Sequence, residues 1–276
     1  MKRRGRTWVT YTVMVGFAIF FLIPLVFMLV SAFKTERAVI DDGSSWRALV
    51  PTNPTMHGFR AAVERADVWH LFLNSLIVVV PIVVAGMVVN SLMGYALARM
   101  RFRGRGVLVA LIVALTIIPF QAVAIPLFYL VSKLGWNNTY YVQILPFIAS
   151  PFFTYLFYTF FLGMPKELEE AARVDGARPL RTFLEIVAPL AKPAYATCAI
   201  LSFLFAWGEL LWPVLVTQGP DVRTLPLGIS EFQGQAPVDW SAIMAFATIM
   251  TIPLLIVFVI FQRQFVRGVA SSGLKG

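Results

Sequence analysis

The sequence predicts an all-α membrane protein with six transmembrane helices, and three observations support this fold class. Of the 276 residues, 59% are hydrophobic and only 13% are charged, whereas a soluble domain carries about 25% charged residues. The apolar residues form six runs, each long enough to cross a bilayer as a helix. The positive charges gather in the segments that these runs would place on one side of the membrane.

The first apolar run extends from about Trp8 to Phe33 and follows four basic residues near the N-terminus. This pattern resembles a secretory signal peptide, and Val30-Ser31-Ala32 would suit a cleavage site. However, the run exceeds 20 residues and contains Pro24, whereas the apolar part of a signal peptide spans about 7 to 15 residues. We therefore interpret it as the first membrane span, followed by a polar external loop over residues 34–71.

The second run, residues 72–98, carries a stripe of small residues that lets membrane helices pack closely. The stripe recurs at intervals of four and consists of Gly86, Asn90, Gly94 and Ala98. Four arginines follow within residues 99–105. Burying them in lipid would cost more than about 10 kcal/mol, at about 2.5 to 3.5 kcal/mol each, so the chain must leave the bilayer there.

Prolines interrupt the third and the fourth run, which cover residues 107–131 and 140–163. Each run contains two prolines that remove backbone donors, so we expect kinked or locally opened helices. They are Pro119 and Pro126 in the third run, and Pro146 and Pro151 in the fourth. The fifth and sixth runs cover about residues 194–217 and 242–262.

Six spans place both termini on the same side of the membrane. With that topology, one side holds 16 of the 23 Lys and Arg residues. Since cytoplasmic segments are enriched in Lys and Arg, both termini are predicted to be cytoplasmic. We divide the chain into an N-terminal part with the first span and external loop (1–71), a transmembrane domain (72–262) and a cytoplasmic tail (263–276).

The segment from Met164 to Pro193, called the bracket below, is a polar interval between two apolar runs on the predicted cytoplasmic side. Pro165 and the carboxylates after it favour a helix start, and Gly176 is placed to end that helix. Pro179 can open a second amphipathic helix, which Pro189 is expected to stop. The charges of the bracket balance, whereas a segment lying on anionic lipid should carry a basic excess. We therefore expect the bracket to dock on a protein, and an ordinary interfacial hairpin is the alternative.

Several kinds of chemistry are missing from the sequence. It contains no Gly-Lys pair, hence no phosphate-binding loop, and no nucleophile elbow or metal-ligand set of His and Cys. The net charge of +9 does not indicate nucleic-acid binding, because no soluble fold presents a basic patch. Glu209 is the one clear acid within an apolar run, so a pump driven by an ion gradient is disfavoured. We expect the energy for transport to come from a separate protein that pushes on the bracket.

Residues of the bracket resemble the EAA loop of permease subunits of bacterial ATP-binding cassette (ABC) importers. They agree with the family pattern of EAA, a glycine four residues later and a downstream I-x-x-P. The matching residues are Glu170, Ala171, Ala172, Asp175, Gly176, Ala177, Ile186 and Pro189. Further matches, ending at Lys275-Gly276, resemble the maltose-permease-type branch, which imports carbohydrates and, in some members, glycerol phosphates. Trp207-Gly208-Glu209 stands where the family has Trp-Asn-Glu.

The resemblance implies a type I ABC importer permease in the bacterial cytoplasmic membrane, with a short cytoplasmic coupling helix between the fourth and fifth spans. It implies four kinds of partner: a second, similar permease in a heterodimer, two cytoplasmic ATP-binding subunits, an external substrate-binding protein and membrane lipid. The bracket residues would sit in a cleft on one ATPase. The chain itself would be a non-catalytic subunit without a cofactor, and ATP and Mg²⁺ would bind to the ATPases.

Polar and aromatic residues of the spans are candidates for the solute pathway. They are Glu209, Trp207, Gly208, Gln121, Asn90 and Ser91. Each has an alternative interpretation: the acid can extend toward the membrane surface, and the polar side chains can bond between helices. Trp207, Trp212 and Trp136 fit an aromatic belt at the membrane surface better than sugar stacking. Cys198 is interpreted as a small packing residue.

The leading interpretation of the whole chain is the permease subunit of an ATP-driven carbohydrate importer. One alternative is an ABC permease for another solute, such as glycerol phosphate, an amino acid, a polyamine or phosphate. Another is a six-span secondary transporter or channel that works alone. The last alternative predicts transport by the isolated chain under a gradient, whereas the leading interpretation predicts none.

Overall fold

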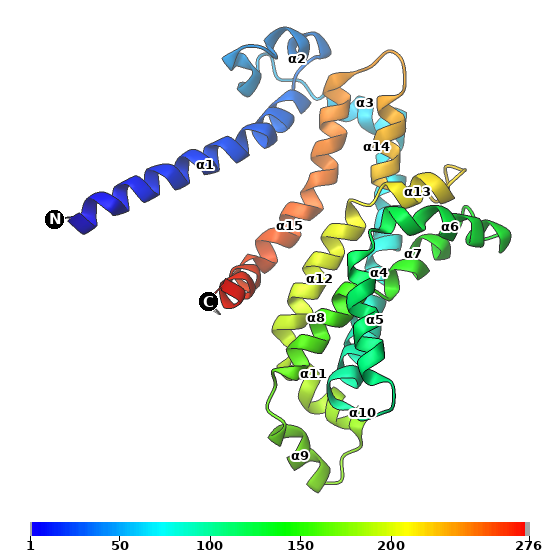
Figure 1. Cartoon of the computed structure of the whole chain (residues 1–276). Coiled ribbons are helices and arrows are strands. Elements are labelled where there is room, and N and C mark those ends of the chain that lie inside the picture. Colours follow the sequence, from blue (N-terminus) through cyan, green and yellow to red (C-terminus); the bar gives the residue numbers. More distant parts are fainter. Residues whose placement is uncertain (1, 274–276) are drawn as a thin grey trace. The chain divides into compact units, whose positions relative to one another are not determined.

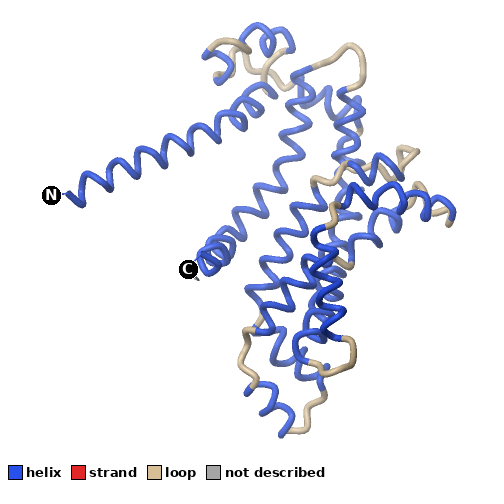
Figure 2. Tube along the Cα trace, viewed as in Figure 1, coloured by secondary structure: helices blue, strands red, loops and turns tan. Residues whose placement is uncertain are grey.

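The computed structural model describes residues 2–273, and the side chains of residues 8–230 and 232–262. Within this range the chain is helical and contains no strand (Figure 2). Two compact units form: unit 1 comprises the chain up to residue 72 with residues 227–253, and unit 2 comprises residues 73–226 with the chain from 254 onward. Unit 1 thus includes a segment that the sequence analysis groups with the transmembrane domain. The Lys275-Gly276 match lies outside the described residues.

The helices follow one another along the chain as labelled in Figure 1. Before the bracket they are α1 (Lys2–Ala32), α2 (Glu36–Asp42), the 3₁₀ helix η1 (Trp46–Leu49), α3 (His57–Ala66), α4 (Val68–Arg99), α5 (Arg105–Ile117), α6 (Phe120–Lys133), α7 (Tyr140–Ile148) and α8 (Pro151–Leu162). The bracket and the rest of the chain contain α9 (Glu167–Val174), α10 (Pro179–Thr182), the π-helical turn η2 (Phe183–Val187), α11 (Ala188–Leu190), α12 (Lys192–Trp207), α13 (Leu211–Val216), α14 (Leu225–Gln233) and α15 (Trp240–Gly273).

Six apolar spans are present if each of two bent helix pairs counts as one span. Within the described residues, four helical stretches are long and apolar enough to cross a membrane: Trp8–Ala32, Val68–Arg99, Tyr140–Leu162 and Trp240–Gln262. The bent pairs are α5 with α6, which meet at 101°, and Pro179–Leu190 with α12, which meet at 78°. The fold class predicted from the six apolar runs is therefore confirmed.

Prolines mark the interruptions in the third and fourth spans, as predicted. The third span bends between α5 and α6, where Pro119 stands as the residue before α6. The fourth span is interrupted at Ala149 and Ser150, and Pro151 begins α8 while the Ser150 hydroxyl accepts from the Phe153 amide. Pro126 and Pro146 lie inside α6 and α7 and do not end them.

The predicted bounds of the fifth span, residues 194–217, are wrong. α12 begins at Lys192 and ends at Trp207, and α13 is a separate helix. The Glu209 carboxylate accepts a hydrogen bond from the Trp212 amide at 3.0 Å, which caps the start of α13. Gly208 and this acid thus favour a new helix start, because a side-chain acceptor can satisfy an amide that a continuous helix would have used.

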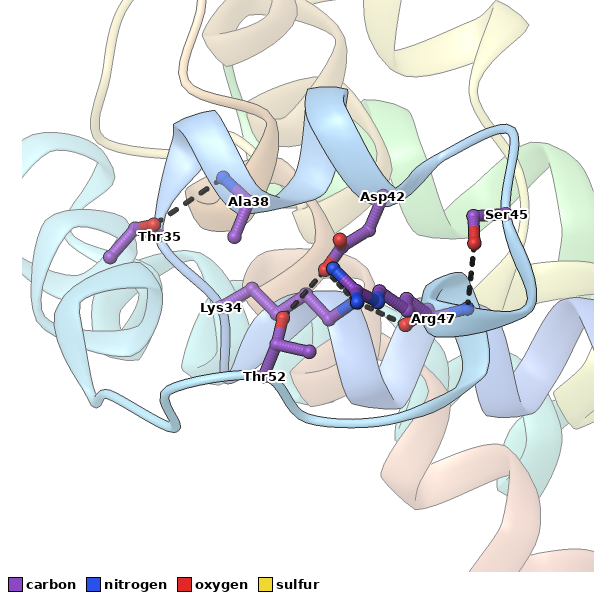
Figure 3. Close-up of polar contacts among 7 residues, drawn as sticks. All are labelled: Lys34, Thr35, Ala38, Asp42, Ser45, Arg47 and Thr52. Atoms are coloured by element: carbon purple, nitrogen blue, oxygen red, sulfur yellow. Dashed lines mark hydrogen bonds and ion pairs between the residues drawn. The ribbon is translucent and has the colours of Figure 1, made fainter.

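The segment after α1 in unit 1 is folded around a buried lysine. The side chain of Lys34 is 1% exposed, and its Nζ donates to Asp42 Oδ2 at 2.9 Å and to the Arg47 carbonyl at 2.6 Å (Figure 3). Thr52 Oγ1 donates to the same Asp42 oxygen at 2.6 Å. These bonds, called the Lys34 clasp below, hold α2 and η1 together. The predicted polar loop therefore contains ordered helices.

We predict that acid loosens the Lys34 clasp. Hydrogen bonds from Thr52 and Lys34 hold the pKa of the Asp42 carboxyl below its ordinary value of 3.8. Because the folded pKa is depressed, the stabilisation is complete above the ordinary value and is lost as the pH falls through the folded pKa. Hydrogen-exchange protection factors of residues 34–52 should fall toward pH 3, and Asp42→Asn should lower them already at pH 7. Protection that is constant down to pH 3 would contradict this prediction.

The small residues of α4 pack against the fourth span within unit 2, as the stripe predicts. A β-carbon at Gly94 would lie 2.7 Å from Phe157 Cβ, and one at Gly86 would lie 3.3 Å from the Ile148 carbonyl oxygen. Ala98 is buried in a cluster with Phe157 and other side chains of α8. The close approach of the two spans therefore depends on the absence of larger side chains.

Candidate functional site

The bracket begins with α9, whose start and end follow the predicted signals. Three carboxylates occupy the first turn, where they favour the helix N-terminus. At the other end, Gly176 has φ +79° and its amide donates to the Arg173 carbonyl at 3.0 Å. The Ala177 amide donates to the Ala172 carbonyl at 2.9 Å, which completes a helix end that requires a left-handed residue. The prediction that Gly176 ends this helix is confirmed.

The second arm of the bracket runs from Pro179 to Leu190, so the predicted stop at Pro189 is wrong. A π-helical turn, η2, precedes the proline, and the Ala188 amide donates to the Phe183 carbonyl five residues earlier. This turn changes the hydrogen-bond register just before Pro189, which lies in the first turn of α11 and there has no amide to be satisfied. The chain bends only at Ala191, before α12.

One face of the bracket is built into the core of unit 2. The buried cluster contains side chains of α4, α8, the second arm and α12. Its members are Tyr95, Ala98, Phe153, Phe157, Phe161, Phe183, Val187, Ala191, Ala194 and Cys198. The interpretation of Cys198 as a packing residue is confirmed. The second arm is therefore packed against the membrane spans.

Arg99, at the end of α4, ties α9 to the second span. Its Nε lies 3.1 Å from Glu169 Oε1, and its Nη2 donates to the Met164 carbonyl. The two charged side chains are only 5% and 15% exposed. Sequence reasoning missed this pair, because it used Arg99 only to mark the end of a span and Glu169 only as a helix-start carboxylate.

The other face of the bracket is exposed. Among the residues matched to the EAA pattern, Glu170, Ala171, Asp175, Gly176 and Pro189 are exposed, Ala177 and Ile186 are half-buried, and Ala172 is buried. Large apolar side chains lie on the same segment, and Val174, Leu180 and Leu184 are 88%, 60% and 58% exposed. Figure 1 shows α9 at one end of unit 2, beyond the ends of α8 and α5. The bracket thus presents both apolar and charged groups outside the packed spans.

A cavity of about 440 Å³ lies within unit 2, and three helix interruptions open onto it. Ile118 lines it at the bend of the third span, Ser150 lines it at the break of the fourth, and Glu209 lines it between α12 and α13. Within a membrane segment, non-helical backbone is stable only where it is buried in protein or lines a cavity. Breaks of this kind place solute sites in membrane transporters.

The structure brings one of the predicted pathway residues, Glu209, to this cavity. Trp207 is buried and stacks on Phe203, with ring centroids 5.3 Å apart. Gly208 and Gln121 are exposed and lie outside the cavity lining. The residue that sequence reasoning placed in the aromatic belt, Trp212, lines the cavity instead. Since both tryptophans are buried, the belt interpretation is wrong for Trp207 and Trp212.

Asn90 and Ser91 are buried and are not part of the cavity lining. The Asn90 amide nitrogen donates to the Gly86 and Ile148 carbonyls at 2.6 and 2.9 Å. Its oxygen accepts from the Ser150 amide and from Thr154 Oγ1, both at 2.8 Å. Asn90 therefore satisfies the backbone groups that the break of the fourth span leaves without helical partners.

Sequence reasoning missed the other polar residues of the cavity. They are Gln143, Ser150, Ser202 and Thr224. The sequence did contain a signal for Gln143, because a side-chain amide within an apolar membrane run needs a hydrogen-bond partner among the neighbouring helices. No signal existed for Thr224, since it lies in the connection between the fifth and sixth runs and reaches the cavity only through the fold.

Comparisons with known proteins agree with a membrane transport subunit. Residues 90–271 match the family described as "Binding-protein-dependent transport system inner membrane component". The chain is 33% identical over 280 residues to the arabinooligosaccharides transport system permease protein AraQ of Halalkalibacterium halodurans, with 100% of both chains covered. It is 34% identical over 286 residues to the diacetylchitobiose uptake system permease protein DasC of Streptomyces coelicolor, again with 100% of both covered.

A solved structure shares the fold. It is a chain of a bacterial ABC transporter involved in the import of the acidic polysaccharide alginate, with a TM-score of 0.83 and 23% identity. The match covers 92% of this chain and 95% of that one. This likeness shows the fold, and the family match and the relatives above show the class, a permease of a binding-protein-dependent transport system. The chain belongs to the binding-protein-dependent transport system inner membrane component family.

Proposed function

We propose that this chain is the membrane-spanning permease subunit of an ABC importer for a carbohydrate. The observation that carries the proposal is the full-length similarity to permeases named for arabinooligosaccharide and diacetylchitobiose uptake. The cavity supports it, because it combines apolar walls with a few polar side chains, the composition of small-molecule sites.

Both termini and the bracket lie in the cytoplasm in this proposal. The partners are a second, similar permease, two ATP-binding subunits and an external substrate-binding protein. ATP and Mg²⁺ bind to the ATPases, and this chain carries out no hydrolysis. The exposed apolar side chains Val174, Leu180 and Leu184 support docking of the bracket on an ATPase, since a short segment rarely exposes three such groups to water.

Movement of the bracket reaches the cavity through the buried cluster. The second arm of the bracket contributes Phe183 and Val187 to that cluster, and α8 contributes Phe153. Phe153 also lines the cavity. Because packed cores deform little, closure of the ATPases would move α4, α8 and α12 with the bracket and change access to the cavity.

Reconstitution tests the proposal. The chain should be purified with its partner permease, ATPases and binding protein, and placed in proteoliposomes with an arabinooligosaccharide or diacetylchitobiose outside. ATP-dependent uptake by the complete complex, and none by the chain alone, is the expected result. Gradient-driven uptake by the isolated chain would instead identify a secondary transporter.

Two substitutions in the bracket test the coupling role. Glu170→Lys reverses an exposed charge, and Gly176→Pro forces φ to about −65° where the bracket needs +79°. Both variants should insert into the membrane, lose uptake and release the ATPase during purification. Gly135→Pro is the matched control, because Gly135 also has a positive φ, +70°, but ends α6 outside the bracket. Normal uptake in both bracket variants would contradict the coupling role.

A further inference from the structure

The side chain of Asn90 bridges the two helices that the break of the fourth span separates. Its Nδ2 donates at 2.9 Å to the carbonyl of Ile148, the last residue of α7. Its Oδ1 accepts from the Ser150 amide and from Thr154 Oγ1, both at 2.8 Å, and these two groups belong to the start of α8. Since Asn90 itself lies on α4, one amide group joins α4, α7 and α8 within unit 2.

Protein groups fill the whole hydrogen-bonding capacity of this amide. A side-chain amide has two donor hydrogens, and its oxygen accepts two bonds. The second hydrogen of Asn90 goes to the Gly86 carbonyl at 2.6 Å, and the residue is 1% exposed. Because carbonyls only accept and the Ser150 amide only donates, the orientation of the amide is fixed. Asn90 therefore has no free group for a solute, and its contacts hold the protein itself.

The break that Asn90 holds forms one wall of the cavity. Ala149, Ser150 and Pro151 line it, and the first two of these residues are not helical. Non-helical backbone in a membrane span is stable where protein groups satisfy its amides and carbonyls. Asn90 does so on both sides of Ala149, through the Ile148 carbonyl and the Ser150 amide. The position of this wall therefore depends on where α4 places Asn90.

The other end of α4 is tied to the bracket. The helix continues without a break from Asn90 to Arg99, a rise of about 14 Å at about 1.5 Å per residue. Arg99 pairs with Glu169 of α9 and donates to the Met164 carbonyl. Because an unbroken helix moves as a rigid element, a displacement of the bracket that reaches Arg99 also reaches Asn90.

We propose that Asn90 is a positioning residue, which makes the break of the fourth span follow α4 when the bracket moves. The inference rests on the proposed permease function and adds a second route from the bracket to the cavity. The buried cluster joins whole helices to the bracket by packing. Asn90 instead joins α4 by hydrogen bonds to the non-helical residues that line the cavity.

Cysteine labelling in the reconstituted complex of this chain with its partner permease, ATPases and binding protein tests this role. The one cysteine of the chain is removed by Cys198→Ala. A single reporter cysteine then replaces Ala149 in the break (the break reporter) or Ala206 on α12 (the α12 reporter), and both positions line the cavity. Labelling by a water-soluble maleimide is measured with and without ATP and vanadate. With Asn90 present, the labelling rate of both reporters should change at least threefold.

Asn90→Leu keeps the number of side-chain heavy atoms and removes all four hydrogen bonds. We expect this variant to lose the ATP-dependent change at the break reporter and to retain the change at the α12 reporter, because α12 is joined to the bracket through the buried cluster. In the chain without reporters, ATP-driven uptake should fall at least tenfold.

Thr154→Val is a milder variant that tests the same bonds if Asn90→Leu does not fold. It removes only the bond from Thr154 Oγ1 to Asn90, so the change at the break reporter should fall at least twofold. Thr159→Val is the matched control, because Thr159 lies on the same helix, is exposed and donates to the Leu156 carbonyl at 2.9 Å. The control should leave both reporters and uptake unchanged.

The two reporters separate this inference from a general structural role and from the proposed function. An unchanged response of the break reporter in Thr154→Val and in any folded Asn90→Leu complex would overturn the inference and leave the proposed function intact. An equal loss of response at both reporters would show a merely structural role and would overturn the inference as well. Absence of ATP-driven uptake of every carbohydrate by the unmodified complex would overturn the inference and the proposed function together.

Discussion

Gly94→Leu is expected to prevent the folding of unit 2. A β-carbon at this position would lie 2.7 Å from Phe157 Cβ and 2.9 Å from the Tyr158 amide nitrogen. Both atoms are fixed to the backbone of α8, so a rotamer change cannot relieve the contact. Overpacking by a single methyl group typically costs about 1–3 kcal/mol, and the rest of a leucine side chain has no space at all. We therefore expect the destabilisation caused by the whole leucine side chain to approach the free energy of unfolding of a domain, about 5–15 kcal/mol.

The thermal melting and size-exclusion profile of the detergent-purified chain measure this effect. Gly94→Ala should lower the melting temperature, and Gly94→Leu should yield aggregated or degraded protein. Gly106→Leu serves as the control, because a β-carbon there would meet no atom within 4 Å. A Gly94→Leu chain that elutes and melts as the unmodified chain does would contradict the close packing of α4 against α8.

The interval-of-four pattern that contains Gly94 shows what periodicity can predict. Helix faces repeat within a few residues, so the stripe, the spans and the start of α9 were all readable from local sequence. Gly176 likewise indicates a helix end, because few residues other than glycine adopt the left-handed backbone conformation found there. Local signals of this kind predicted the fold class, the start of α9 and its end at Gly176.

Interruptions inside apolar runs were predicted only where proline marks them. Gly208 and Glu209 interrupt the apolar residues between α12 and α13, but neither is a proline, and sequence reasoning kept the run continuous. The π-helical turn before Pro189 has no sequence signal of its own, and its first and last residues, Phe183 and Val187, are buried in the core. A local cap by Glu209 accompanies the start of α13, whereas the π-helical turn accompanies core packing that the local pattern does not show.

Sites assembled from distant residues were the least predictable. Gln143 and Thr224 meet at one cavity although 81 positions separate them, and Thr224 stands in what the sequence presents as a polar connection. Asn90 was recognised as a polar residue in a span, yet its role depends on where the fourth span breaks. A single sequence can identify such residues as candidates, but only the three-dimensional structure shows which of them lie together.

Arg99→Ala is expected to uncouple ATP hydrolysis from transport. The guanidinium joins the end of α4 to Glu169 and to the Met164 carbonyl, and both charged side chains are largely buried. Removing one partner of a buried ion pair leaves the other without compensation, a loss of about 3–5 kcal/mol. The lost energy weakens the contact between α9 and the second span. When the ATPases close, α9 should therefore move without moving the spans. We expect uptake to fall at least tenfold while the complex retains most of its basal ATPase activity.

Two comparisons separate this positioning role from a general loss of stability. Exchanging the charges in Arg99→Glu with Glu169→Arg should recover part of the uptake, because the ion pair is restored in reverse. Arg181→Ala removes a pair with Glu185 at 2.9 Å whose side chains are 68% and 58% exposed, and such exposed pairs contribute at most about 1 kcal/mol. Arg181→Ala should therefore leave the melting temperature of the complex unchanged, which makes it the control for stability. Uptake by Arg99→Ala within twofold of the unmodified complex would show that the second arm alone transmits the movement of the bracket, through Phe183 and Val187.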